Sequence, residues 1–315
     1  MSKTALLFAG QGAQAVGMGQ DLAAQFPAAQ EWFERANDAL GYDLAAICFN
    51  GPEAELTKTE HAQPGIFLVS WICFELLKER VPQLRFEAAA GLSLGEFTAL
   101  TAAGAMSFED GLRVVRQRGR FMQEACEVTQ GGMAAVIGLE EAPTREVCAE
   151  AGVVLANLNC PGQLVISGEA PRIAKACELA KARGARRAIP LTVAGAYHSP
   201  LMASAQPKLR EELVKIRLAA PAAPVISNVT AHAHGSDIPV RLVEQVCSSV
   251  RWEESMRALL AQGFTRFIEL GPGTALSGFM KRIDKNAQIL NVADVASLEA
   301  TAEGMKEECC LAPTA

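Results

Sequence analysis

The most informative short motif in the sequence is Gly91-Leu92-Ser93-Leu94-Gly95, a G-x-S-x-G pattern. The apolar stretch Phe86–Ala90 precedes it and predicts a strand, and the residues after it predict a helix. A sharp strand–turn–helix needs small residues on both sides of the serine, and it exposes the hydroxyl beside the free N–H groups of the helix. The motif therefore predicts a nucleophile elbow with Ser93 as the nucleophile. The alternative is a glycine-rich structural turn with an ordinary serine.

A serine hydroxyl needs a base before it can act as a nucleophile. The sequence holds four histidines, at positions 61, 198, 232 and 234. His198 is followed by Ser199-Pro200, and a stretch before proline favours a rigid loop of the kind that often carries functional residues. His198 is therefore the best candidate for the base, the alternative being a buried structural histidine. His232 and His234 form an H-x-H pair, but no further cluster of ligands supports a metal site, so no metal is expected.

The predicted helix Ser107–Glu124 carries four arginines. Arg113, Arg116 and Arg120 follow helical spacing and predict a solvated face, whereas Arg118 lies off that stripe. A guanidinium that turned into a cleft could hold a carboxylate through two parallel hydrogen bonds. Arg118 is thus a candidate for binding an anionic substrate, although spacing alone leaves open which arginine turns inward.

A glycine-rich stretch, Gly10-Gln11-Gly12-Ala13-Gln14-Ala15, follows the predicted strand Thr4–Ala9 and fits a G-x-G-x-x-A pattern. A dinucleotide-binding fold would place a second strand, ending in Asp or Glu, about 20 residues further on. The corresponding stretch Glu31–Arg35 predicts helix, which argues against a nucleotide site. The alternative is that the bare backbone of this loop approaches a reacting centre and offers N–H groups to an oxyanion.

The composition limits the class of protein. The 315 residues are 50% hydrophobic and 20% charged, which is enough for a sizeable core, and the length corresponds to roughly two domains. The net charge of −6 argues against general nucleic-acid binding. Nine cysteines without C-x-x-C spacing indicate reduced thiols. We expect a soluble, cytoplasmic protein, because the sequence lacks a signal-peptide pattern and any apolar run near the ~20 residues of a membrane span.

The predicted elements divide into two sets. Residues 131–191 are expected to run strand, helix, strand, strand, helix, strand, which is the ferredoxin-like βαββαβ unit. The other segments mix strands and helices and predict an α/β fold with a parallel sheet. We therefore expect a discontinuous catalytic domain over residues 1–128 and 197–315, with a small inserted domain over 129–196. Further expectations are a helical stretch over Met18–Leu40, strands at Val225–Asn228 and Phe267–Leu270, and a frayed tail over Glu307–Ala315.

Several motifs occur in one order and resemble those of the malonyl-CoA:acyl-carrier-protein transacylases. The resemblance covers about residues 4–295, nearly the whole chain, and it implies a hydrolase-like α/β core with a ferredoxin-like insert, in agreement with the predicted elements. The motifs are Phe8-Ala9-Gly10-Gln11-Gly12-Ala13-Gln14, Gly91–Glu96, Gln117-Arg118-Gly119 with Met122-Gln123, Asn159-Cys160-Pro161-Gly162-Gln163, Tyr197-His198-Ser199-Pro200-Leu201-Met202, Val250-Arg251-Trp252 and Glu269-Leu270-Gly271-Pro272-Gly273.

The resemblance also implies a reaction and the residues that perform it. A malonyl group would move from malonyl-CoA to the phosphopantetheine thiol of an acyl carrier protein through a malonyl-serine intermediate (ping-pong), for fatty-acid or polyketide synthesis. Ser93 would be the nucleophile and His198 the base, without an acidic third member. The backbone N–H groups of Gln11 and Leu94 would form the oxyanion hole, and Arg118 would bind the malonyl carboxylate.

Three positions depart from the common pattern of that family. Arg251 stands where glutamine is frequent, and its backbone carbonyl would orient His198, a role that a change of side chain preserves. Leu92 stands where many members have histidine, and Tyr197 where many have phenylalanine or serine. The bulk of Tyr197 argues against branched acyl groups.

The carrier protein implied by the resemblance is usually acidic, so this acidic chain would need a local basic surface to dock it. Lys181–Arg187 and Lys281–Lys285 are candidates, the alternative being ordinary solvated helix ends. No cofactor of its own is expected, because the partner carries the phosphopantetheine. No nucleic-acid or membrane partner is expected either.

Two other functions are compatible with parts of these motifs. A serine hydrolase shares the elbow, but it would require an acidic residue between Ser93 and His198 in the sequence. It would also require an HGGG-type oxyanion loop, which this sequence lacks. A non-catalytic module that docks carrier proteins is the other rival, and the intact Ser93 and His198 argue against it.

Overall fold

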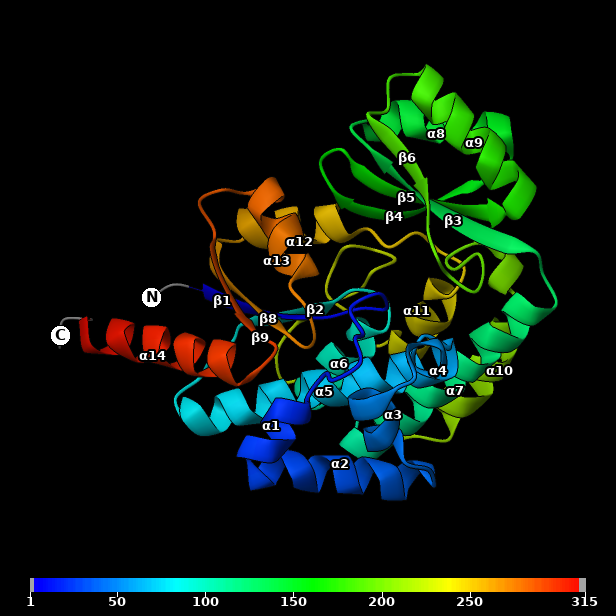
Figure 1. Ribbon diagram of the computed structural model, residues 1–315. Helices are drawn as coiled ribbons and strands as arrows, with labels where there is room; N and C mark the ends of the chain where they lie inside the picture. Colours follow the sequence, from blue (N-terminus) through cyan, green and yellow to red (C-terminus); the bar gives the residue numbers. More distant parts are fainter. Residues whose placement is uncertain (1–2, 312–315) are drawn as a thin grey trace.

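The computed structural model describes residues 3–311, with side chains described through residue 306. Its larger sheet is parallel and has the strand order β7-β2-β1-β8-β9 (Figure 1). The strands are short and apolar, as expected of strands that are covered on both faces. They are β1 (Lys3–Phe8), β2 (Ala88–Gly91), β7 (Val225–Ile226), β8 (Phe264–Leu270) and β9 (Gln288–Val292).

Helices cover both faces of this sheet. Leu6 and Phe8 of β1 enter one hydrophobic cluster, whereas Ala5 and Leu7 enter another, because successive side chains of a strand point to opposite faces. The larger cluster is formed with α1 (Gln20–Gln25), α2 (Pro27–Leu40), α3 (Leu44–Asn50), α4 (Glu53–Leu56), α5 (Thr59–Arg80), α6 (Gly95–Ala102), α7 (Phe108–Glu127), α10 (Ala205–Val214), α11 (Ile238–Gln245) and α14 (Val295–Leu311). The smaller one is formed with α12 (Trp252–Ala261) and α13 (Ala275–Ile283).

The second sheet is antiparallel and has the order β4-β5-β3-β6. It is built from β3 (Gly131–Ile137), α8 (Glu141–Ala151), β4 (Val154–Cys160), β5 (Gln163–Glu169), α9 (Ala170–Ala182) and β6 (Arg187–Pro190), which is the predicted βαββαβ order. The side chains beneath α8 and α9 form a hydrophobic cluster of their own on the face away from the rest of the molecule (Figure 1), whereas Met133, Ala156 and Val165 join the larger cluster.

The two sheets are joined at the edge strand β4. Leu158 donates its N–H to Val250 O at 2.9 Å, and Val250 donates its N–H to Ala156 O at 2.8 Å. Val250 thus extends β4 by a single parallel bridge. A short 3-10 turn, η1 (Pro200–Met202), follows where the chain re-enters the larger part.

The elbow between β2 and α6 confirms the local prediction from the G-x-S-x-G motif. Ser93 has φ 55°, a left-handed conformation that costs energy for any residue except glycine. A Cβ atom at Gly91 would lie 1.9 Å from the carbonyl carbon of Gly95, and one at Gly95 would lie 2.3 Å from Phe8 O. Glycine at both flanks is therefore required by space and not only by flexibility.

Replacing Gly91 with alanine is expected to lower the free energy of unfolding by more than about 2 kcal/mol, because the new methyl group meets backbone atoms that cannot move independently. Gly278→Ala is the matched control, since that exposed helical position has nothing within 4 Å of a new Cβ and alanine favours helix. Urea unfolding of both variants is the measurement. Equal stability of the two would contradict this account of the elbow.

Some expectations about individual elements are wrong. The helical stretch over Met18–Leu40 divides at Pro27, which begins α2 because proline lacks the N–H needed inside a helix and holds Phe26 extended. The tail was expected to fray from Glu307, but α14 continues to Leu311, and residues 312–315 lie outside the described part.

None of the described helices is both long and apolar enough to cross a membrane. The seven cysteines with described side chains are free.

Candidate active site

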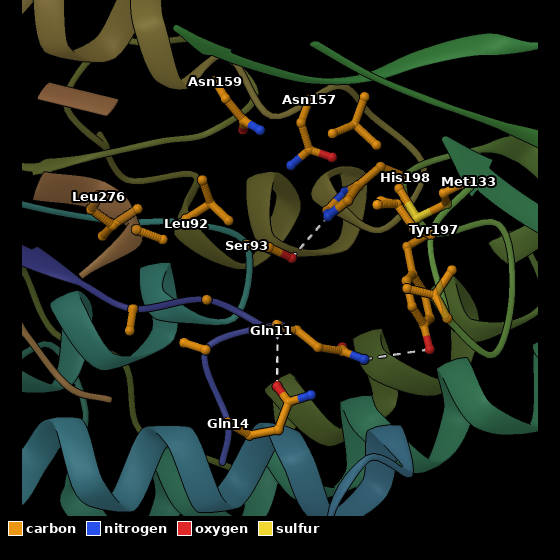
Figure 2. Close-up of a pocket in the computed structure, with 18 of the residues that line it drawn as sticks. Gln11, Gln14, Leu92, Ser93, Met133, Asn157, Asn159, Tyr197, His198 and Leu276 are labelled. Carbon is orange, nitrogen blue, oxygen red and sulfur yellow. Dashed lines mark hydrogen bonds between the residues drawn. The ribbon is translucent and has the colours of Figure 1, made fainter. Parts of the chain in front are cut away.

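Ser93 and His198 point toward each other in the pocket (Figure 2). The distance from Ser93 Oγ to His198 Nε2 is 2.8 Å, although 105 residues separate them along the chain. His198 shares the left-handed backbone of Ser93, with φ 57°. The sequence predicted this pairing, and the structure places the two groups within hydrogen-bonding reach.

Arg118, the buried arginine of α7, points at the same serine. Its Nη2 donates to Ser93 Oγ at 3.0 Å and to Gln245 Oε1 at 2.9 Å, and its Nη1 donates to Gln63 Oε1 at 2.7 Å. The side chain is 1% exposed, whereas the side chain of Arg113 on the same helix is 56% exposed. The structure thereby resolves which arginine turns inward.

A cavity of about 370 Å³ opens onto the serine and histidine between the two parts of the molecule (Figure 2). The larger part contributes the Gly10–Gln14 loop, and the smaller sheet contributes Met133, Asn157 and Asn159. Tyr197 lines the same cavity, and its hydroxyl contacts Thr59 Oγ1 and lies 3.5 Å from Gln11 Nε2.

The proposed oxyanion donors lie in two loops that touch. Leu92 donates its N–H to Phe8 O at 3.1 Å, and a Cβ at Gly10 would lie 2.4 Å from Leu92 O. Only glycine permits this approach. Neither the Gln11 N–H nor the Leu94 N–H donates to an acceptor within the described part of the chain. Both groups therefore remain available to another acceptor.

The model of the acyl transferase domain family matches residues 5–299. The chain belongs to this family. The malonyl CoA-acyl carrier protein transacylase of Bacillus subtilis (strain 168) is 45% identical, over 98% of this chain and 99% of that one. The crystal structure of malonyl CoA-acyl carrier protein transacylase from Clostridium perfringens superposes with a TM-score of 0.93 at 41% identity, covering 99% of both chains. The predicted family and α/β fold class are confirmed.

One solved relative of this acyl transferase domain was studied with a partner. The solved structure of a type II PKS acyl-carrier protein in complex with its malonyl-transacylase contains a chain similar to this one. The TM-score is 0.92 at 38% identity, over 96% of this chain and 100% of that chain.

The prediction that the Arg251 carbonyl orients the histidine of this acyl transferase domain is wrong. His198 Nδ1 lies 2.9 Å from Gln245 O. Gln245 ends α11, and the last carbonyls of a helix have no partner inside the helix, so this oxygen can accept from a side chain. Arg251 instead precedes α12 as its N-cap residue, where its backbone N–H donates to Asn228 O and its guanidinium pairs with Glu254.

The hydrogen bonds fix the protonation pattern of the histidine. A backbone carbonyl only accepts, so Nδ1 carries the proton and Nε2 presents its lone pair to the Ser93 hydroxyl. Burial, and secondarily the positive charge of Arg118, lowers the pKa of His198 to about 4. Burial also lowers the pKa of Arg118 to about 10, with Glu96 opposing the shift, so Arg118 is a cation at neutral pH.

The pH dependence of the first half-reaction follows from the pKa of His198. We expect kcat/KM for malonyl-CoA to stay level from pH 7 to about 5 and to fall with a midpoint near 4. Stability changes in the same direction. Between the ordinary pKa of 6.5 and about 4 the unfolded state binds a proton that the folded state does not, so the free energy of unfolding decreases as the pH falls. A pH–rate profile with a midpoint at 6.5 would show that the imidazole is solvated.

Gln245 and Gln63 are the functional residues that sequence reasoning missed. Gln245 lies in the last turn of α11, where carbonyls without a partner inside the helix are expected, so the position of a helix end is the signal that could have found it. Gln63 carried no such signal, because glutamine inside an apolar helix has no distinctive spacing.

Proposed function

We propose that this protein transfers a malonyl group from malonyl-CoA to the phosphopantetheine thiol of an acyl carrier protein, in fatty-acid or polyketide synthesis in the cytoplasm. The observation that carries the proposal is a buried, cationic guanidinium bonded to the hydroxyl of an elbow serine. A carboxylate-bearing acyl group is the substrate that such an arrangement recognises. The names of the Bacillus and Clostridium relatives, malonyl CoA-acyl carrier protein transacylases, support the same substrate.

In the first half-reaction, the Ser93 hydroxyl gives its proton to His198 Nε2 while Ser93 Oγ attacks the thioester carbonyl of malonyl-CoA. The backbone N–H groups of Gln11 and Leu94 hold the negative oxygen of the tetrahedral intermediate. Each such donor contributes about 3 kcal/mol in comparable sites. The carbon–sulfur bond then breaks, the CoA thiolate takes the proton from Nε2, and a malonyl-serine ester remains.

The second half-reaction reverses these steps with a different thiol. His198 Nε2 accepts the proton of the phosphopantetheine thiol, and the sulfur attacks the ester carbonyl. Ser93 Oγ leaves and recovers its proton from Nε2. The protein needs no cofactor of its own in this scheme, because the partner carries the phosphopantetheine.

The malonyl carboxylate would meet Arg118 while its thioester carbonyl lies over Ser93. Gln63 accepts from Nη1 of the guanidinium and Gln245 accepts from Nη2. The plane of the guanidinium is therefore fixed before the substrate arrives. The carboxylate therefore contributes orientation as well as affinity.

For the carrier protein we propose a basic surface as the dock. Arg186 and Arg187 are exposed at the end of the smaller sheet, as is Lys281 on α13, whereas Arg183 is occupied by Glu150. An ionic dock predicts that the second half-reaction slows with added salt more than the first.

The test is incubation with malonyl-CoA followed by intact-mass measurement, and then addition of a carrier protein bearing phosphopantetheine. A malonyl adduct on Ser93 that disappears as the carrier gains the same mass supports the transferase. Hydrolysis of malonyl-CoA without transfer would indicate a serine hydrolase, and no reaction would indicate a docking module.

A further inference from the structure

A second buried polar cluster lies behind the elbow and takes no part in the reaction described above. Glu96, in the first turn of α6, and His234, in the loop between β7 and α11, both have side chains with no exposed surface. His234 Nε2 lies 2.7 Å from Glu96 Oε1. The backbone N–H of His234 donates to Val225 O at 2.9 Å, which ties this loop to β7.

The contact with Glu96 is the one polar contact of the His234 ring within the described part of the chain. The other ring nitrogen, Nδ1, is buried and has no hydrogen-bond partner there. Nε2 therefore carries the proton and donates to the carboxylate. Any influence of the His234 ring on its surroundings through hydrogen bonding therefore passes through the Glu96 carboxylate.

The second carboxylate oxygen of Glu96 positions Gln245. Oε2 accepts from Gln245 Nε2 at 2.7 Å and from Asn228 N at 2.9 Å. The same Gln245 Nε2 donates to Ser93 O at 2.9 Å. With the amide nitrogen held between these two acceptors, the amide oxygen must face the other way, where it accepts from Arg118 Nη2.

We propose that His234 is a positioning residue for carboxylate recognition, acting through Glu96 and the side-chain amide of Gln245 on the Arg118 guanidinium. This inference rests on the proposed function. Without a donor at position 234, Glu96 Oε1 is left buried and unpaired, and the carboxylate gains by turning toward another donor. Gln245 Nε2 then loses one of the acceptors that set the direction of its amide, and the Gln245 oxygen that accepts from Arg118 Nη2 is held less firmly.

The experiment compares three variants with malonyl-CoA and with acetyl-CoA, which lacks the carboxylate. His234→Leu keeps the volume but removes the donor, and we expect the KM for malonyl-CoA to rise about tenfold while acetyl transfer changes less than twofold. His234→Gln keeps an N–H near the Nε2 position, and we expect it to restore KM to within about twofold of the original. His232→Leu is the matched control, because His232 is an exposed histidine in the same loop. It should change neither the KM for malonyl-CoA nor the rate of acetyl transfer.

Equal losses with both acyl groups in His234→Leu, or a failure of His234→Gln to rescue, would overturn the inference, since either result fits mere structural damage. If His234→Leu does not fold, His234→Asn provides the same comparison, because its shorter amide does not reach Glu96. The unsubstituted protein is tested alongside for a malonyl adduct on Ser93. A normal adduct with unaltered selectivity in the variants refutes this inference alone, whereas absence of the adduct refutes the proposed function as well.

Discussion

Replacing Ser93 with alanine is expected to reduce malonyl transfer by at least about 10,000-fold, because the covalent intermediate has no other oxygen on which to form. No malonyl adduct should appear in the intact mass of the variant. The fold should be retained, since the side chain of Ser93 fills little space and its backbone is held by Asn228 Oδ1 and Gln245 Nε2.

Ser204→Ala is the control for this substitution, an exposed serine whose side chain caps no helix. It should form the adduct at the original rate. A malonyl adduct on the Ser93→Ala variant would place the nucleophile elsewhere and contradict the proposed reaction.

Replacing Arg118 with alanine is expected to lower malonyl transfer far more than acetyl transfer, although both acyl groups react at Ser93. Malonyl transfer should fall by roughly 100-fold, the value of two charge-assisted hydrogen bonds to a carboxylate. Acetyl transfer should fall much less, because acetyl-CoA offers the guanidinium no charge. The measurement is kcat/KM for both acyl groups.

Arg113→Ala on the same helix is the control, and it should leave the ratio of the two substrates unchanged because that side chain is exposed. The buried Arg118 also supports Ser93, Gln63 and Gln245, so some loss of acetyl transfer is expected from the loosened site. Equal losses for malonyl and acetyl groups would show that Arg118 supports the site without selecting the substrate.

The sequence was sufficient for those parts of the site that depend on local geometry. Small residues around Ser93 leave one backbone path, so the elbow and its flanking strand and helix followed from five residues. The βαββαβ order of the smaller sheet was equally readable, because each strand and helix there has its own short apolar pattern. The strand β9 was missed, since its half-buried residues form no continuous apolar run.

The partners of the histidine could not be derived in the same way. The choice between the carbonyls of Gln245 and Arg251 depends on where α11 ends relative to His198, which is a tertiary distance. The Glu96–His234 contact spans 138 residues, and no local pattern announces it. Hydrogen bonds between residues far apart in sequence produce no periodic pattern of residue types. Inspection of short sequence segments therefore does not reveal them.

The position of the smaller sheet within the chain has a consequence for synthesis on the ribosome. Ser93 emerges before β3, His198 only after β6, and Gln245, which orients the imidazole, later still. The central strand β1 also waits for β8, which begins at Phe264. A nascent chain released before that strand lacks β8 and β9, two of the five strands of the larger sheet, so the scaffold that holds Ser93 against His198 is completed only when nearly the whole chain has been made.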